Sequence, residues 1–210
     1  MSKFRASMAI GITRERRVAA VGFLYLLFCI LLPAPSIAGA PTEQVRATVD
    51  RVLAIVRNSD LKAAGERGDL QTRLAEAIYP RFDFTEMAKR SLGSQWAPRT
   101  VEEQRDFVKI FAGVLGKSYA RQIESYAGQT ILYTREVEDA EYAQVDTKIV
   151  TDKREEISVN YKLHTIGGEW KVYDLVIENI SIVNNYRAQF DRVIARSSFG
   201  ELVRAMKEKQ

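Results

Sequence analysis

The spacing of apolar residues divides this 210-residue chain into helical segments and one strand-rich segment. Before residue 130 and after residue 181, apolar side chains recur every three or four positions, which places them on one face of a helix. Capping-box patterns, in which Asp, Thr or Ser stands three residues before Glu, mark helix starts at Asp83, Thr100 and Ser198. The predicted helices cover 42–57, 70–79, about 84–92, 100–126, 182–196 and a terminal stretch that begins at Ser198.

Four runs rich in β-branched and aromatic residues lie between these helices, at about 130–137, 142–150, 156–164 and 169–177. Turn-forming residues separate them, at Asp139, at Asp152 with Lys153, and at Gly167 with Gly168. Connections this short favour hairpins, which produce an antiparallel meander. We therefore predict an α+β fold, with one four-stranded antiparallel sheet and about six to seven helices.

The stretch from Trp170 to Phe190 joins the last strand to the helix that follows it. Apolar residues occupy both alternating sets of positions in this strand, so both of its faces are expected to be at least partly buried. Helices can cover one face. The pattern by itself leaves open what covers the other.

The first 38 residues have the order of a secretory leader. Five basic residues precede an apolar run from Val18 to Leu32, and Ser36-Ile37-Ala38 follows as a small-x-small site. The alternative is a membrane anchor, but the run is shorter than the roughly 20 residues that a span needs. We expect cleavage after Ala38 rather than Ala40, which leaves 39–210 as a single exported domain.

Removal of the leader changes the charge of the protein. Residues 1–38 hold five of the 31 Lys and Arg residues and one of the 27 Asp and Glu residues, so the remaining chain has 26 of each. The sequence pI near 9.1 therefore comes from the leader. A net charge near zero argues against nucleic acid as a partner, because no excess of cations remains to neutralise phosphates.

Few residues could carry chemistry. The one cysteine, Cys29, lies within the leader, and the one histidine, His164, is expected at an exposed strand end. No second histidine could share a metal, so neither a metal site nor a cofactor is predicted. The sequence also lacks a nucleophile elbow, a phosphate-binding loop and a dinucleotide fingerprint.

Asp174 is the candidate that needs weighing, because it stands in the middle of an apolar strand. A desolvated carboxylate there would have a raised pKa and could act as a base, as in a ketosteroid-isomerase-like enzyme. The structural alternative is that Asp174 pairs with a nearby Arg or Lys, or faces outward. The abundant aromatic residues suit either an ordinary core or an apolar pocket, and composition does not separate the two.

One long motif carries a family resemblance: W-K-V-Y-D at 170–174 followed by N-Y-R-A-Q-F at 185–190. Shorter matching pieces are Phe82-Asp83-Phe84, Met87-Ala88, Leu92-Gly93, Trp96, Glu103-Gln104, Phe107, Phe111, Tyr119, Tyr126-Ala127-Gly128 and Tyr161-Lys162-Leu163. Together they cover about residues 42–198 and resemble the MlaC family of periplasmic phospholipid carriers, also called the toluene-tolerance auxiliary family.

The resemblance implies a carrier rather than an enzyme. Such a protein would hold phospholipid acyl chains in a deep apolar cavity between sheet and helices, as a monomer without cofactor. It would exchange lipid between an outer-membrane lipoprotein–porin complex and an inner-membrane ABC transporter with an MCE-domain subunit, and so maintain outer-membrane lipid asymmetry.

We expect the cavity between the sheet and the helices at 100–126 and 182–195. Its lining is expected to come from Phe107, Phe111, Leu115, Tyr119, Val145, Ile149, Val159, Tyr161, Val172, Val176, Tyr186 and Phe190. Gly113 and Gly116 could mark a moving bend or close packing. Arg187 could brace the strand–helix joint or meet a phosphate group. Other open alternatives are a carrier for a hopanoid or an aromatic solvent, and a structural adaptor without a large cavity.

Overall fold

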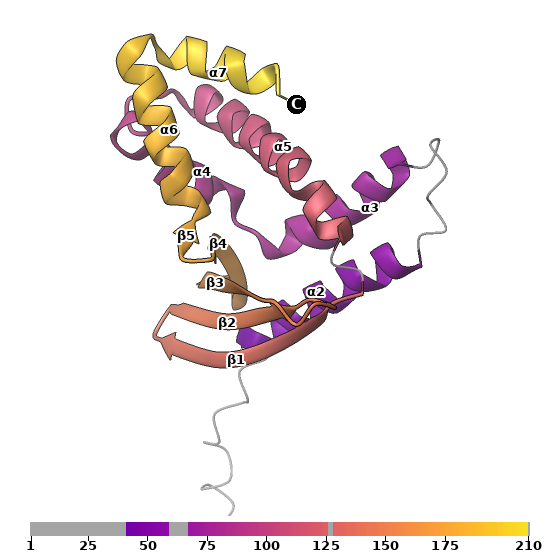
Figure 1. Cartoon of the computed structure of the whole chain (residues 1–210). Helices are drawn as coiled ribbons and strands as arrows, with labels where there is room; N and C mark the ends of the chain where they lie inside the picture. Colours follow the sequence, from indigo (N-terminus) through magenta and orange to yellow (C-terminus); the bar gives the residue numbers. More distant parts are fainter. Residues whose placement is uncertain (1–40, 59–66, 126–127, 210) are drawn as a thin grey trace, which may run out of the picture. The chain divides into compact units, whose positions relative to one another are not determined.

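The computed structural model describes residues 41–58, 67–125 and 128–209. The leader predicted at 1–38 lies outside these residues. The described part contains six α-helices and two short 3-10 helices. Figure 1 labels the α-helices and the strands. The α-helices are α2 (Pro41–Arg57), α3 (Arg67–Ile78), α4 (Phe84–Leu92), α5 (Val101–Ser125), α6 (Ile182–Arg196) and α7 (Phe199–Lys207). The 3-10 helices are η1 (Tyr79–Arg81) and η2 (Gly93–Gln95).

The predicted capping residues are confirmed at three helix starts. The Asp83 carboxylate accepts a hydrogen bond from the Glu86 amide at 2.9 Å, which satisfies a free N–H group of the first turn of α4. Thr100 and Glu103 exchange two such bonds before α5, and the Ser198 hydroxyl accepts from the Glu201 amide at the start of α7. Local sequence therefore determines where these helices begin.

The predicted α+β fold is confirmed, with a sheet that is one strand larger than expected. The described strands are β1 (Thr130–Asp139), β2 (Tyr142–Val150), β3 (Glu156–Ile166), β4 (Glu169–Ile177) and β5 (Ile180–Ser181), all antiparallel and in sequence order. The two-residue strand β5 follows a tight turn in which Glu178 and Asn179 have positive φ angles of 47° and 65°. A strand of two residues is too short to produce an alternating pattern, which is why sequence periodicity missed it.

Strand β4 contains a bulge that changes which side chains face inward. Leu163 pairs with Val172 and Lys162 pairs with Asp174, so Tyr173 is an extra residue without a partner on β3. Before the bulge Val172 faces the interior, and after it Leu175 does so. The extra residue therefore reverses, from Tyr173 onward, which alternate side chains of β4 face the interior.

The interior divides into three hydrophobic clusters within the described residues. One joins the helices α4 to α7, a second packs α2 against the sheet, and a third joins α2 and α3. In the first cluster the Phe107 ring lies 5.6 Å from Phe190 and 6.0 Å from Phe111 between centroids. Because the clusters are separate, the space where they approach one another need not be filled by side chains.

Candidate functional site

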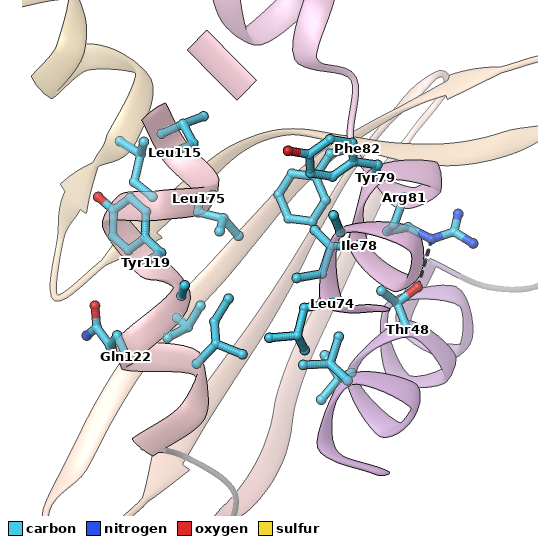
Figure 2. A pocket seen from close by; sticks show the side chains of 18 of the residues that line it. Thr48, Leu74, Ile78, Tyr79, Arg81, Phe82, Leu115, Tyr119, Gln122 and Leu175 are labelled. Carbon is cyan, nitrogen blue, oxygen red and sulfur yellow. Dashed lines mark hydrogen bonds between the residues drawn. The ribbon is translucent and has the colours of Figure 1, made fainter. Parts of the chain in front are cut away.

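A cavity of about 500 Å³ lies between the helices and the inner face of the sheet. This volume falls in the range of roughly 300–1,000 Å³ that is typical of small-molecule sites. Most of its lining is aliphatic or aromatic. Figure 2 shows Leu115, Tyr119 and Gln122 on one side and Leu74 and Ile78 on the other. The arrangement suits an apolar ligand.

Helices α2 and α3 form one wall of the cavity. Val45, Val49, Val52 and Leu53 of α2 line it, and they belong to the apolar stripe that already predicts this helix. Helix α3 contributes Leu74, Ala75 and Ile78. The apolar spacing predicted both helices but did not assign either of them to the cavity.

The second half of α5 forms the opposite wall, with Leu115, Tyr119 and Ile123. Gly113 and Gly116 also line the cavity. A Cβ atom at Gly116 would lie 3.5 Å from the Tyr79 hydroxyl, which is ordinary van der Waals contact. The absence of a side chain at Gly116 therefore leaves space in the wall and is not imposed by a tight contact.

The sheet forms the floor of the cavity. The floor residues are Ile131 on β1, Ile149 on β2, Val159 and Tyr161 on β3, and Leu175 and Ile177 on β4. Tyr161 pairs across the strands with Leu175, and Val159 pairs with Ile177. The β4 bulge is what aligns Leu175 and Ile177 with these partners, because without it Val176 would face the cavity.

The structure brings five of the twelve expected lining residues together at the cavity: Leu115, Tyr119, Ile149, Val159 and Tyr161. Phe107, Phe111, Tyr186 and Phe190 instead pack with one another in the helical cluster, because α6 lies against α4, α5 and α7 there. Val145 and Val172 are fully buried under α2. Val176 lies on the other face of the sheet, since its two neighbours line the cavity. Helix α6 reaches the cavity through Ile182.

Arg81 is a polar residue in this apolar lining. Its guanidinium donates to the Thr48 hydroxyl, the Gln44 side-chain oxygen and the Trp170 carbonyl, so it ties η1 to α2 and β4. Figure 2 shows the hydrogen bond between Arg81 and Thr48. Burial lowers the pKa of this guanidinium, the nearby carboxylate of Glu169 opposes that shift, and Arg51 adds to it. Arg81 therefore holds the α2 wall in place.

Two tyrosines on the inner side of the sheet have perturbed hydroxyls. Burial raises the pKa of Tyr133 to about 12, and it also raises the pKa of Tyr161, with Tyr133 adding to the effect. The Tyr133 hydroxyl is sealed from solvent and has no hydrogen-bond partner within the described residues. Its ring lies under the Arg46 guanidinium at 4.0 Å.

The carboxylate of Asp174, the candidate base, is held by hydrogen bonds within the protein. This carboxylate is buried and accepts hydrogen bonds from the Ser181 hydroxyl and the Val183 amide at the start of α6. The expected Arg or Lys partner is thus replaced by the N-terminus of a helix, which favours negative charge.

His164 and Arg187 also have structural contacts. The expectation that His164 is exposed is wrong, because its Nε2 atom lies 3.0 Å from the Asp83 carboxylate and its side chain is largely covered. A Cβ atom at Gly93 would lie 3.0 Å from the Arg187 guanidinium, so Arg187 packs against the end of α4 and away from the cavity lining.

No group of three or more His, Cys, Asp or Glu side chains among the described residues could hold a metal ion. None of the helices in this part of the chain has the length and hydropathy needed to cross a membrane.

An α+β domain with an apolar cavity between sheet and helices has the architecture of a protein that binds an apolar small molecule. A family model described as "MlaC protein" matches residues 46–208, and the chain belongs to this family.

Relatives with known names are distant in sequence but match over most of their length. The intermembrane phospholipid transport system binding protein MlaC of Haemophilus influenzae is 20% identical over 88% of this chain and 89% of the relative. The toluene tolerance protein ttg2D of Pseudomonas putida is 24% identical over 76% and 75%. The solved structure of a phospholipid-binding protein from Ralstonia solanacearum, in complex with a phospholipid, has a TM-score of 0.74 at 26% identity. It covers 81% of this chain and 97% of that one.

Proposed function

We propose that this protein is a periplasmic carrier that holds phospholipid acyl chains in the cavity between α2, α3, α5 and the sheet. The observation that supports this most directly is the cavity itself, whose lining is dominated by side chains without polar atoms. The Ralstonia protein of similar fold was solved with a phospholipid, which supports phospholipid as the chemical class of the ligand here.

The physical need for such a cavity follows from the solubility of the ligand. Each methylene group contributes about 0.8 kcal/mol when it leaves water, so a chain of about 16 carbons costs on the order of 13 kcal/mol to expose. A lipid that crosses an aqueous compartment must therefore be enclosed. Recognition of the head group can be weak, which suits a mature chain whose net charge is near zero.

The route of transport that we propose runs through the periplasm. The leader predicted at 1–38 would deliver the domain at 39–210 to the periplasm as a monomer. There it would exchange phospholipid between an outer-membrane lipoprotein–porin complex and an inner-membrane ABC transporter with an MCE-domain subunit. The name of the Haemophilus relative, an intermembrane phospholipid transport system binding protein, supports the transport of phospholipid between membranes.

The test is organic extraction of the protein purified from cells, followed by mass spectrometry. We expect phospholipid at a stoichiometry near one or two molecules per chain. A protein that contains only polar molecules, or none, would contradict the proposal. Recovery of a hopanoid or an aromatic solvent in place of phospholipid would identify a carrier of a different ligand.

A pair of variants connects the lipid to this cavity. Ile149 lies on the cavity floor, and its neighbour Lys148 points to the opposite face, where it pairs with Glu156 at 2.7 Å. Ile149→Trp should fill the cavity and remove most of the lipid, whereas Lys148→Trp should leave the lipid content unchanged. Equal lipid in the two variants would place the ligand elsewhere.

A further inference from the structure

Tyr161 differs from the other residues of the cavity floor because it carries a hydroxyl. It lies near the middle of β3, between Val145 of β2 and Leu175 of β4 in the strand pairing. The other floor residues are all aliphatic. The Tyr161 side chain is partly buried, and burial raises the pKa of its phenol.

The Tyr161 hydroxyl has no hydrogen-bond partner within the described residues. It differs in this from most buried tyrosine hydroxyls, which find a partner. The Tyr133 hydroxyl is sealed inside the protein, whereas the Tyr161 side chain keeps part of its surface accessible. Because Tyr161 lines the cavity, we infer that this accessible part includes the hydroxyl and faces the cavity.

The occupant of the cavity therefore determines whether this hydroxyl is satisfied. Water in a cavity of about 500 Å³ can hydrogen-bond to it. The methylene groups of an acyl chain cannot, because they have neither donor nor acceptor atoms. A phosphate is an unsuitable partner at this position, because the other floor residues are all aliphatic and offer it no positive charge. An acyl chain that covers the floor leaves a buried polar group unpaired.

We propose that the Tyr161 hydroxyl weakens the hold of the cavity on acyl chains and so speeds the release of lipid. This inference rests on the proposed function. A carrier must release its ligand as well as enclose it, and a purely apolar floor would retain a long chain more strongly. The hydroxyl removes part of that affinity at one position without changing the shape of the floor.

The test is Tyr161→Phe, which keeps the ring and removes the oxygen. An unpaired buried hydroxyl corresponds to about 5- to 100-fold in an equilibrium constant, so we expect Tyr161→Phe to release lipid more slowly within that range. Tyr142→Phe is the matched control, because the same atom is removed from a side chain that is 49% exposed and lies outside the cavity lining.

The measurement is the rate of transfer of tritiated dipalmitoylphosphatidylglycerol from loaded protein to phosphatidylcholine vesicles, with thermal unfolding as a check of folding. A second variant, Val159→Thr, adds a hydroxyl to the same floor and should release lipid faster than the wild type. Slower transfer by Tyr161→Phe together with faster transfer by Val159→Thr supports the inference. Unchanged or faster transfer by Tyr161→Phe overturns it, and faster transfer would show that the hydroxyl donates to an oxygen of the ligand. Wild-type protein that takes up no lipid would instead overturn the proposed function.

Discussion

The carboxylate of Asp174 on β4 accepts a hydrogen bond from the backbone amide of Val183 in the first turn of α6, at 3.1 Å. Its other oxygen accepts from the Ser181 hydroxyl at 2.7 Å, and that hydroxyl in turn accepts from the Asn184 amide at 3.0 Å. One buried carboxylate therefore joins the last long strand to the helix that follows it. Both oxygens are occupied by this joint, which supports a structural role for Asp174.

Replacing Asp174 by Ala should destabilise the protein by about 2–3 kcal/mol, because hydrogen bonds to a buried charged group are lost and an amide of α6 is left unpaired. The free energy of unfolding, measured by urea denaturation, checks this. Asp191→Ala, at an exposed position of α6, should change stability by less than about 0.5 kcal/mol. Equal stability of the two variants would contradict the assigned role.

The bulge at Tyr173 predicts opposite effects for two adjacent residues of β4. Leu175→Trp should enter the cavity and lower bound lipid on the order of tenfold, because overpacking an apolar site costs about 1–3 kcal/mol. Val176→Trp, on the other face, should retain lipid. Lipid content by extraction and melting temperature are measured together. Loss of lipid from Val176→Trp with retention in Leu175→Trp would mean that the strand keeps its regular alternation.

Two glycines should respond differently to alanine. Gly93 ends α4 with a φ angle of 53°, and a Cβ atom there would approach the Arg187 guanidinium. Gly93→Ala should therefore cost about 1–2 kcal/mol of stability. Gly116 lies within α5 with space around it, so Gly116→Ala should stabilise the helix by up to about 1 kcal/mol. Thermal unfolding distinguishes them, and equal shifts would contradict the different backbone demands.

The buried tyrosines predict a loss of stability at alkaline pH. Burial raises the pKa of Tyr133 from an ordinary value near 10 to about 12 in the folded protein. The unfolded chain therefore releases this proton first, and stability present below about pH 10 is lost as the pH rises through about 12. Between about pH 9 and about pH 11.5, the urea midpoint of unfolding should fall more for the wild type than for Tyr133→Phe. Parallel falls would show that Tyr133 titrates normally.

Near neutral pH the same variant tests the sealed hydroxyl directly. Tyr133→Phe removes a buried polar atom that has no partner in the described structure, so it should be at least as stable as the wild type and gain up to about 1 kcal/mol. A loss of more than about 1 kcal/mol would mean that the hydroxyl is paired in solution.

Sequence alone determined the elements and the fold class. The apolar spacing predicted six helices and four long strands, and the capping residues at Asp83, Thr100 and Ser198 marked helix starts, because both signals depend on contacts between residues close in the chain. The same local character supported the family resemblance along most of the chain. Strand β5 was missed because two residues carry no period.

The position of the cavity depended on the tertiary structure. Phe107 and Leu115 lie on the same helix and both pack in the helical cluster, but only Leu115 also lines the cavity. The two residues differ because different elements pack against α5 at their two positions along the helix. On β4, one extra residue at Tyr173 exchanges Val176 for Leu175 at the cavity floor. Apolar periodicity tells which side chains avoid water, and only the packing of distant elements decides whether protein or empty space lies opposite them.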